Sequence, residues 1–420
     1  MIKSSTARGS IVAPPSKSYT HRAMVLGALT HEPFVLERPL MSEDTRATLN
    51  ALQLMGASIG GGQGAVKISC DELAPAADTV DAKNSGTTMR LMTGIASLLP
   101  SSTTLTGDES LAKRPMAPLV DALRQLGADV SYLGQPGRPP VKVTGPIAGP
   151  AAEIAGGVSS QFISSLLIAC TQKAGDTTIR VGGEMVSRPY VDITLDVLRA
   201  FGGEARESKE GFQVKGGQRL HRDDYVVPGD YSSAAFALAA AAMTSGDVTV
   251  KNLDRDSPQG DKAIVRHLRD FGADVDVTAD SVRVSADRLD GLEIDVRDTP
   301  DLFPVLAVLG AVAEGETVLK GGANLRYKES DRIATTTAFL TAMGARVRPT
   351  EDGCQISGGA KLQGADIETH GDHRILMAAA LAGLVSTSGT RIADDSSYEV
   401  SYPGFLRDMH QLGCRLEVRR

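Results

Sequence analysis

Helix-capping residues open six predicted helices, and several of these segments carry basic residues that capping does not require. The segments are Ser16-Lys17-Ser18-Tyr19-Thr20-His21-Arg22, Asn84-Ser85-Gly86-Thr87-Thr88, Ser159-Ser160-Gln161, Gly229-Asp230-Tyr231-Ser232-Ser233, Thr299-Pro300-Asp301 and Gly371-Asp372-His373-Arg374. Capping explains their Ser, Thr, Asn and Asp residues, and for Asp230-Tyr231-Ser232 it is as good an explanation as function. It does not explain Lys17, Arg22 or Arg374, whereas exposed amides at a helix start beside a cation form an anion site. Because Lys17 and Arg22 are five residues apart, they should not share a helical face unless the loop brings both to a ligand.

A second group of charges lies in loops that precede longer helices. These loops read Ala112-Lys113-Arg114-Pro115, Ser187-Arg188-Pro189-Tyr190 and Arg326-Tyr327-Lys328-Glu329-Ser330-Asp331-Arg332. In the last of them, Lys328 and Arg332 are spaced i, i+4 and repel each other on a solvated helix start. Glu329 and Asp331 could offset that repulsion within the chain, or a bound anion could, and ligand binding is the favoured interpretation.

These segments recur because the chain repeats one pattern. Six predicted helices end in similar sequences, whose glycines stand at positions 56, 127, 202, 272, 344 and 413. The spacings of 71, 75, 70, 72 and 69 residues indicate one folding unit repeated six times. Residues that recur in every copy are expected to maintain the fold, and residues that differ between copies are candidates for catalysis or binding.

One copy shows the predicted elements of the unit. Ser232–Met243 is small and apolar throughout, which predicts a helix buried on all sides. Val248–Val250 predicts a strand, and Lys262–Phe271 predicts a second helix with one apolar face. Val275–Val277 and Val282–Val284 alternate and predict a hairpin. Each unit therefore reads helix, strand, helix, strand, strand.

Six units divide naturally into two groups of three. The proline-bearing segments 12–15 and 226–229 are the predicted crossings between the groups. The predicted lobes are residues 1–14 with 228–420, and residues 15–227. An open solenoid is the alternative, and it is disfavoured because the charge before the second helix varies greatly between copies, whereas a scaffold usually keeps a more uniform surface.

Composition excludes several classes of function. The 420 residues carry a formal charge of −7, 4% aromatic residues and no Trp, which argues against a nucleic-acid partner. The longest apolar stretches are too short to cross a bilayer, and the N-terminus lacks the apolar run of a signal peptide. The four scattered cysteines, Cys70, Cys170, Cys354 and Cys414, are typical of reduced thiols. A cytoplasmic protein without a membrane partner is expected.

A metal site is the alternative interpretation of His370, Asp372 and His373. Three such residues on one turn lack the usual spacing of helical metal ligands, and the sequence shows no Cys or Glu-rich partner for them. No metal is therefore predicted.

The segments taken together resemble the 5-enolpyruvylshikimate-3-phosphate (EPSP) synthase family. The resemblance rests on Ser16-Lys17-Ser18, Asn84-Ser85-Gly86-Thr87-Thr88-Met89-Arg90, Lys113-Arg114-Pro115-Met116, Ser159-Ser160-Gln161-Phe162, Lys328-Glu329-Ser330-Asp331-Arg332 and Gly371-Asp372-His373-Arg374, in this order. It implies a two-domain inside-out α/β barrel with six βαβαββ repeats, three per domain. It also implies transfer of the enolpyruvyl group of phosphoenolpyruvate to the 5-hydroxyl of shikimate 3-phosphate in chorismate and aromatic amino-acid biosynthesis. No cofactor is implied, and a monomer is expected.

The resemblance assigns substrate ligands to both lobes. It implies that phosphoenolpyruvate is held by Lys17, Gly86, Arg114, Gln161, Arg332 and Arg374. A planar guanidinium suits a carboxylate, so Arg332 and Arg374 are expected at that group and Lys17 and Arg114 at the phosphate. The residues that resemble shikimate 3-phosphate ligands are Ser18, Arg22, Ser159, Ser160, Gln161, Ser187, Asp301, Asn324 and Lys328, with Tyr190 as a neighbour that packs on the ring.

The implied reaction needs a proton delivered to the methylene carbon of phosphoenolpyruvate and one removed from the attacking hydroxyl. Glu329 resembles the acid and Asp301 the base, and Lys328 could share either transfer. Two carboxyl groups beside several cations can be driven to different protonation states. Closure of the two lobes is expected to exclude water and to bring both sets of ligands together.

Val400 departs from the family pattern, whereas Gly86 retains it. Many members carry a lysine where Val400 stands, three residues before Pro403, so Lys17 and Arg114 are expected to bear more of the phosphate charge. Gly86 keeps the small residue of glyphosate-sensitive members, which predicts inhibition by glyphosate.

Two rival functions are weaker. The related enolpyruvyl transferase that acts on UDP-N-acetylglucosamine usually has a cysteine shortly before the arginine that matches Arg114, and residues 107–113 contain none. A noncatalytic phospho-ligand binding protein would not need Asp301 and Glu329 beside its cations.

Overall fold

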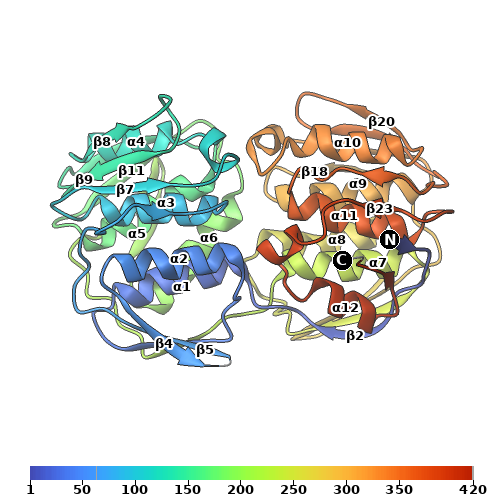
Figure 1. The fold of residues 1–420 in the computed structure, drawn as a ribbon, viewed down its shortest axis with the longest axis horizontal. Helices are drawn as coiled ribbons and strands as arrows, with labels where there is room; N and C mark the ends of the chain where they lie inside the picture. The colour runs from blue at the N-terminus through green and yellow to red at the C-terminus, as the bar shows by residue number, and fades with distance from the viewer. Residues whose placement is uncertain (63, 419–420) are drawn as a thin grey trace. The chain divides into compact units, whose positions relative to one another are not determined.

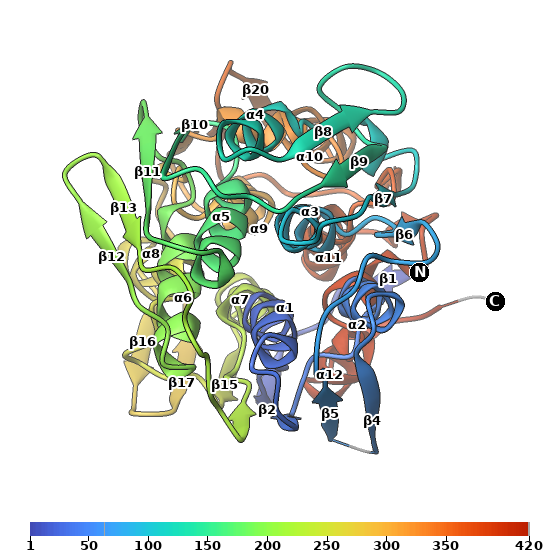
Figure 2. The same cartoon turned by 90° about the vertical axis from the view of Figure 1, so that its left-hand side faces the viewer.

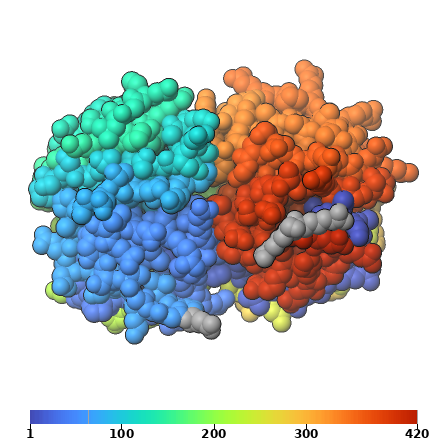
Figure 3. Space-filling model, in the orientation of Figure 1, coloured from blue at the N-terminus to red at the C-terminus, as the bar shows by residue number. Residues whose placement is uncertain are grey.

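The chain folds into two compact units (Figure 1). The computed structural model describes residues 1–62 and 64–418. Unit 1 comprises Met1–Pro14 and Pro228–Arg420, and unit 2 comprises Pro15–Val227. In the space-filling view of Figure 3, the surface of unit 1 shows colours from both ends of the bar, because both ends of the chain contribute to this unit.

Unit 2 contains three repeats of helices and strands. Its elements are α1 (Lys17–Ala28), β3 (Phe34–Glu37), α2 (Glu43–Leu54), β4 (Ser58–Gly62), β5 (Ala65–Ser69), β6 (Val80–Asp81), α3 (Gly86–Ala96), β7 (Thr103–Thr106), the 3-10 helix η1 (Leu111–Lys113), α4 (Ala117–Gln125), β8 (Asp129–Tyr132), β9 (Val141–Thr144), β10 (Ala151–Ala155), α5 (Ser160–Gln172), β11 (Thr177–Gly182), α6 (Arg188–Ala200), β12 (Ala205–Ser208), β13 (Gly211–Val214) and β14 (Asp224–Val226).

Unit 1 contains the other three repeats. Its elements are β1 (Ile2–Lys3), β2 (Arg8–Val12), α7 (Tyr231–Met243), β15 (Asp247–Lys251), η2 (Gly260–Ala263), α8 (Ile264–Asp270), β16 (Asp274–Val277), β17 (Ser281–Ser285), β18 (Glu293–Asp295), η3 (Pro300–Leu302), α9 (Phe303–Val312), β19 (Glu316–Lys320), η4 (Ala323–Tyr327), α10 (Arg332–Ala342), β20 (Arg346–Pro349), β21 (Cys354–Ser357), β22 (Asp366–Ile367), α11 (His373–Leu384), β23 (Arg391–Ile392), η5 (Ser397–Val400), α12 (Phe405–Gln411) and β24 (Arg415–Leu416). The predicted helix, strand, helix and hairpin of residues 232–284 are confirmed as α7, β15, α8 and β16–β17.

One strand order recurs in the sheets. The four-stranded sheets have the orders β14-β3-β5-β4, β6-β7-β9-β8, β10-β11-β13-β12, β16-β17-β15-β2 and β18-β19-β21-β20. In each sheet, one edge strand runs parallel to its neighbour, and the other two strands form an antiparallel hairpin. One strand of the hairpin pairs antiparallel with that neighbour; in the first sheet, β14 is parallel to β3, and β5 of the hairpin β4–β5 pairs with β3. The ribbons β22-β23 and β1-β24 complete the same order, because Ile2 and Thr390 exchange backbone hydrogen bonds of 2.8 and 3.0 Å between them.

The two edge strands β2 and β14 pair with strands of a repeat other than the one that follows them in the chain. Strand β2 directly precedes α1, but it pairs with β15, which follows α7. Strand β14 directly precedes α7, but it pairs with β3, which follows α1. The segments after β2 and β14 therefore carry the chain from one unit to the other.

The six glycines of the sequence repeat end helices in the same conformation. Their φ angles are 99°, 100°, 77°, 97°, 86° and 83° at residues 56, 127, 202, 272, 344 and 413. At Gly56, the glycine N–H donates to the carbonyl of Gln53, and the next N–H, of Ala57, donates to Leu52. The other five copies repeat this pair of bonds, which defines the Schellman motif. A left-handed residue is needed at each helix end, and glycine adopts it without steric cost.

The first helix of each repeat forms the interior of its unit. Every residue of α7 is buried, as its small apolar sequence predicts, and α9 and α11 are buried almost throughout. In unit 2, Figure 2 shows α1, α3 and α5 surrounded by the strands β4–β13. A fully buried Leu, Ile or Phe contributes about 1.5–3 kcal/mol, so these helices supply much of the hydrophobic stabilisation. Among the described residues, none of the helices combines the length and apolar character needed to span a bilayer.

Buried His267 of α8 is expected to make the protein less stable in mild acid. Burial and the charge of Arg266 lower the pKa of His267 to about 4, against the opposing effect of Asp270. In the unfolded chain, His267 has an ordinary pKa of about 6.5. Between pH 6.5 and 4, His267 therefore binds a proton in the unfolded chain but not in the folded chain. Stability is retained above pH 6.5 and falls as the pH drops toward 4, by about 2 kcal/mol between pH 7.5 and 5.

Urea unfolding at several pH values checks this effect. The His267→Leu variant should lose that part of the pH dependence, whereas the same substitution at exposed His31 should leave the slope unchanged. Equal slopes in the His267→Leu variant and the wild-type protein would contradict the prediction.

Candidate active site

In unit 1, three acidic residues surround the guanidinium of Arg332. Arg332 begins α10 and is 1% exposed. Its Nη1 lies 2.7 Å from Asp301, its Nη2 lies 2.7 Å from Glu329, and its Nε lies 2.9 Å from Asp372. Asp372 caps α11, and Asp301 lies in η3, so three helix starts of unit 1 converge on one arginine.

The surrounding carboxylates keep Arg332 charged. Burial by itself would lower the pKa of Arg332, but Asp372, Glu329 and Asp301 outweigh that effect and raise the pKa well above its usual value. Four donor contacts of Arg332 are thus directed at protein carboxylates. An anionic ligand that binds Arg332 has to compete with these acids.

Arg374 lies beside the same acids. It is the second residue of α11, is 2% exposed, and donates from Nη2 to Asp301 at 3.4 Å and from Nη1 to the Ser232 carbonyl at 3.1 Å. Its guanidinium carbon lies 5.9 Å from the ring centroid of Phe236, within cation–π range. The two arginines therefore share Asp301.

The charge repulsion predicted between Lys328 and Arg332 is offset by acids of the chain. Glu329 takes part, as the sequence allowed, but Asp331 instead caps α10 and pairs with Arg326 at 2.8 Å. Asp301 and Asp372, distant in sequence, complete the neutralisation of Arg332. Half-buried Lys328 follows η4, which contains buried Asn324.

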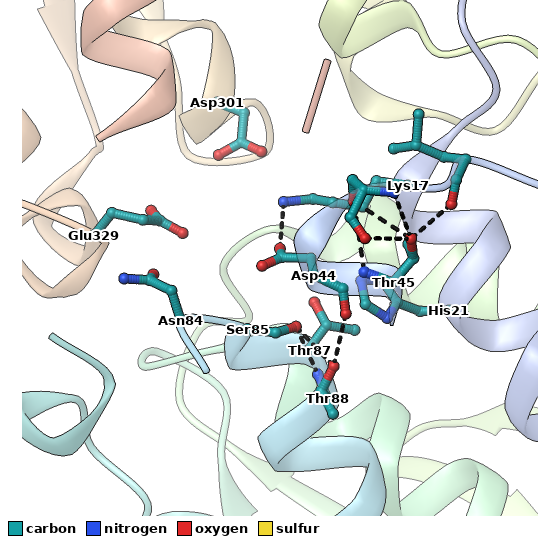
Figure 4. Close-up of polar contacts among 12 residues, drawn as sticks. Lys17, His21, Asp44, Thr45, Asn84, Ser85, Thr87, Thr88, Asp301 and Glu329 are labelled. Atoms are coloured by element: carbon teal, nitrogen blue, oxygen red, sulfur yellow. Dashed lines mark hydrogen bonds and ion pairs between the residues drawn. The ribbon is translucent and has the colours of Figure 1, made fainter. Parts of the chain in front are cut away.

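In unit 2, Lys17 forms an ion pair with Asp44 (Figure 4). The Nζ–Oδ2 distance is 2.8 Å, and the side chains are 17% and 7% exposed. Lys17 begins α1, and Asp44 lies in the first turn of α2, where its charge also suits the helix dipole. Asp44 was not among the residues predicted from the sequence, because an acid after Ser42 is explained by the helix start alone.

A chain of buried hydrogen bonds ends at the backbone of Asp44. His21 Nδ1 is 2.8 Å from the Thr48 hydroxyl, which is 2.7 Å from the Thr88 hydroxyl; the latter lies 3.2 Å from the Asp44 carbonyl and 2.8 Å from Ser85. Figure 4 shows the contacts of Thr88 with Asp44 and Ser85. Because the Asp44 carbonyl can only accept, a consistent assignment has His21 donate to Thr48, Thr48 to Thr88 and Thr88 to Asp44. Burial lowers the pKa of His21 well below its usual value, with Lys17 and Arg22 adding to the effect, so the ring is neutral. The chain joins the starts of α1, α2 and α3.

Gly86 lies against a second group of polar side chains in unit 2. A Cβ at residue 86 would stand 2.3 Å from Arg90 Nη1 and 3.3 Å from both Arg114 Nη1 and Gln161 Oε1. Arg114 donates to Asn84 at 2.6 Å, and Gln161 donates to Thr87 at 3.1 Å. The structure thus brings Gly86, Arg114 and Gln161 together, three residues that the family resemblance assigns to one ligand, and adds Arg90, which was not among the predicted ligands.

Arg22 points away from Lys17. It is 2% exposed and donates to Thr194 at 2.7 Å, to Ser164 at 3.1 Å, and to the carbonyls of Ser18 and Tyr190 at 2.9 Å each. Burial lowers the pKa of Arg22 to about 10, with Tyr190 and Tyr19 opposing this effect. Its donors therefore tie α1 to α5 and α6, and its role as a substrate ligand stays a prediction.

The remaining predicted ligands of unit 2 lie at helix starts. Ser159 caps α5 by accepting from the Gln161 N–H at 3.3 Å, and Ser160 begins that helix. Ser187 precedes α6 with φ of 56°, a left-handed conformation that costs a non-glycine residue energy and is typical of functional positions.

The predicted absence of a metal site was based on the spacing of His370, Asp372 and His373. Asp372 is engaged with Arg332 and with the Arg374 N–H at 2.9 Å. Within residues 1–62 and 64–418, no group of three or more His, Cys, Asp or Glu side chains is arranged to hold a metal ion.

Comparison with known proteins agrees with this geometry. The family model described as EPSP synthase (3-phosphoshikimate 1-carboxyvinyltransferase) matches residues 2–409. Proteins with the latter name from Methanocorpusculum labreanum and Methanothrix thermoacetophila are 44% and 46% identical to this chain, covering 99% of it and 98% and 99% of their own lengths. The solved structure of EPSP synthase from Acinetobacter baumannii superposes with a TM-score of 0.83 at 32% identity, over 100% of this chain and 99% of that one, which confirms the predicted fold class. The chain belongs to the EPSP synthase family.

Proposed function

We propose that this chain transfers the enolpyruvyl group of phosphoenolpyruvate to the 5-hydroxyl of shikimate 3-phosphate and releases phosphate. This is the 3-phosphoshikimate 1-carboxyvinyltransferase reaction of the shikimate pathway. The observation that carries the proposal is the pair of buried arginines, Arg332 and Arg374, held among Asp301, Glu329 and Asp372 in a member of this family. Cations suited to a carboxylate and acids suited to proton transfer are thus next to one another.

Residues of both units are proposed to bind phosphoenolpyruvate. Arg332 and Arg374 of unit 1 take the carboxylate, since a guanidinium binds it with two parallel hydrogen bonds. Lys17 and Arg114 of unit 2 take the phosphate, with Gly86 and Gln161 beside them. Because Val400, the last residue of η5, is uncharged, Lys17 and Arg114 carry more of this task than in members with a lysine there.

Shikimate 3-phosphate is proposed to bind through polar residues at helix starts and in loops. These residues are Ser18, Arg22, Ser159, Ser160, Gln161, Ser187, Asp301, Asn324 and Lys328, with Tyr190 packed on the ring. Support comes from their match to the family motifs and from the arrangement of Ser159, Ser160 and Ser187 at the starts of α5 and α6.

The acids of unit 1 are proposed to move the protons. Asp301 removes the proton of the attacking hydroxyl, and Glu329 delivers one to the methylene carbon, while Lys328 shares either transfer. Protonation turns the methylene carbon of phosphoenolpyruvate into a methyl group. The enolpyruvyl group of the product carries a methylene again, so this methyl group loses a proton when phosphate leaves. A substrate carboxylate that binds Arg332 would displace Glu329 from its 2.7 Å ion pair, and loss of an ion pair favours the protonated acid.

A phosphate-release assay tests the function. Phosphate should appear only when phosphoenolpyruvate and shikimate 3-phosphate are both present, and the new product should contain both organic parts. Replacing shikimate 3-phosphate by UDP-N-acetylglucosamine should abolish release. Release with the UDP-sugar instead would favour the rival enolpyruvyl transferase, and tight binding of both substrates without release would favour a noncatalytic binding protein.

Glyphosate should inhibit the wild-type enzyme, and the Gly86→Ala substitution should weaken that inhibition. The added methyl group forces Arg90, and to a lesser extent Arg114 and Gln161, to shift. One methyl group is worth about 10- to 200-fold in discrimination, so the inhibitory concentration should rise by about tenfold or more. The KM for phosphoenolpyruvate should rise as well.

Inhibition curves for three proteins check this prediction. The Gly60→Ala variant is the control, because a Cβ at residue 60 meets nothing within 4 Å. Wild-type turnover that persists at high glyphosate, or an unchanged curve for Gly86→Ala, would refute the prediction.

We also propose that the enzyme acts as a monomer in the cytoplasm, as the sequence predicts. Its four cysteines are buried thiols without disulfide bonds, which suits a reducing compartment.

A further inference from the structure

We propose that Asp261, which no family motif singled out, is a positioning residue that orients Arg374 and sets the charge around Asp301. The inference rests on the proposed function, because Arg374 and Asp301 matter for activity only if they bind and process the substrates. Asp261 lies in η2 of unit 1 and is 2% exposed. A carboxyl group buried this deeply is costly unless the surrounding structure uses it.

The first line of support is a chain of contacts from Asp261 to Arg374. The Ser232 hydroxyl donates to Asp261 Oδ2, and the Ser232 carbonyl accepts from Arg374 Nη1 at 3.1 Å. Ser232 is the second residue of α7, so a tie on its side chain also fixes the direction of its carbonyl. Arg374 is held on its other side by Asp301 and packs over the ring of Phe236.

The segment around Asp261 reinforces this tie. Gln259, two residues earlier and 5% exposed, accepts from the Tyr231 N–H at 3.0 Å and donates to the Gly229 carbonyl at 2.8 Å. Residues 259–261 therefore hold the start of α7 at three positions, 229, 231 and 232. Asp230 caps α7 through the Ser233 N–H, and Gln259 satisfies the first N–H of the helix, that of Tyr231; capping explains neither the bond of Gln259 to Gly229 nor that of Ser232 to Asp261.

The second line of support is electrostatic. Burial, together with repulsion from Asp301 and Asp230, raises the pKa of Asp261 to about 7, against the opposing effects of Arg374 and the Ser232 hydroxyl. These four groups belong to η3, to α7 with its N-cap, and to α11. Above pH 7, a negative charge therefore appears beside the proposed base and the proposed carboxylate ligand. That charge should repel an anionic substrate and compete for Arg374.

The test separates the contact from the charge. The Asp261→Asn variant keeps an acceptor for Ser232 but cannot ionise, whereas Asp261→Ala loses both properties. Ser232→Ala removes the tie but keeps the carbonyl and the Asp261 charge. Asp276→Asn, an exposed acid in β16 of the same repeat, is the matched control.

The KM for phosphoenolpyruvate is measured from pH 6 to 8.5 in each protein. We expect the ratio of wild-type to Asp261→Asn KM to rise from about one at pH 6 to about three- to tenfold at pH 8.5. Changes in the protonation of the substrates affect both proteins equally at each pH, so they do not change this ratio of KM values. We expect Asp261→Ala to raise KM by about tenfold at pH 6, because a displaced ligand loses its alignment, and by less at pH 8.5, where the substitution also removes the repelling charge. Ser232→Ala should raise KM at pH 6 by less than Asp261→Ala does.

Each outcome decides the inference. A ratio that does not change with pH would overturn the electrostatic role, and wild-type KM values at pH 6 in Ser232→Ala and in folded Asp261→Ala would overturn the positioning role. Should Asp261→Ala fail to fold, Ser232→Ala and Asp261→Asn still decide both. A wild-type enzyme without phosphate release would overturn the proposed function and this inference with it, whereas an active enzyme with unaltered variants would overturn this inference alone.

Discussion

The Glu329→Gln variant is expected to lose turnover by about 10²- to 10⁴-fold, the usual contribution of a general acid. Glutamine keeps a carbonyl oxygen that can accept from Arg332, so the 2.7 Å contact and the fold should survive. It cannot deliver a proton to the methylene carbon. The KM for shikimate 3-phosphate should change little, because Glu329 is not among its proposed ligands.

Steady-state kinetics with both substrates, together with binding of shikimate 3-phosphate alone, measures this effect. Glu316→Gln, an exposed acid at the start of β19, is the control and should have wild-type kinetics. If Glu329→Gln turns over at the wild-type rate, the assignment of Glu329 as the acid is wrong. A large loss of shikimate 3-phosphate binding would show instead that Glu329 acts in binding.

The Arg332→Met variant is expected to be destabilised by about 3–5 kcal/mol. Removing one partner of a buried ion pair leaves an uncompensated charge, and here the side chain of Asp372 is 0% exposed. Asp301 and Glu329 lose a partner at the same time. Adding Asp372→Asn to Arg332→Met should restore part of the loss, because the buried negative charge is then removed too.

Urea unfolding followed by two spectroscopic probes measures the loss, since a chain with two compact units need not unfold in one step. Arg288→Met is the matched control: Arg288 is 64% exposed and pairs with Asp290 and Glu314. Exposed pairs contribute about 0–1 kcal/mol, so this control should stay close to the wild type. An Arg332→Met variant as stable as Arg288→Met would contradict the account of the cluster.

The repeat could be predicted because its signals are local. At each helix end, the glycine N–H bonds to the residue three positions earlier, and the N–H of the next residue bonds to the one five positions before itself. The pattern at Gly56 or Gly413 is therefore complete within a short window. The buried helix α7 was likewise evident from its own composition. The prolines at 12–15 and 226–229 predicted where the chain crosses between lobes, but not that β2 pairs with β15 or β14 with β3. These pairings join residues more than 180 positions apart, and no local pattern records the partner.

The candidate site divides in the same way. Its basic residues were identified because they stand where helix caps do not need them. Their partners were missed where the contact is long-range: Asp44 lies 27 residues from Lys17, and Asp301 and Asp372 lie 31 and 40 residues from Arg332. Glu329 and Asp331 were both candidates for offsetting the repulsion between Lys328 and Arg332. Glu329 pairs with Arg332, whereas the side chain of Asp331 caps α10 and pairs with Arg326.

The central proposal is that basic residues of unit 1 and of unit 2 bind the same substrate, phosphoenolpyruvate. The KM for phosphoenolpyruvate in two variants tests it most directly. Lys17→Met removes a cation of unit 2, and Arg374→Met removes one of unit 1. With shikimate 3-phosphate saturating, each substitution should raise that KM by about tenfold or more, since a charged hydrogen bond is worth about 1.5–3 kcal/mol. A KM that rises in one variant and stays at the wild-type value in the other would contradict the claim.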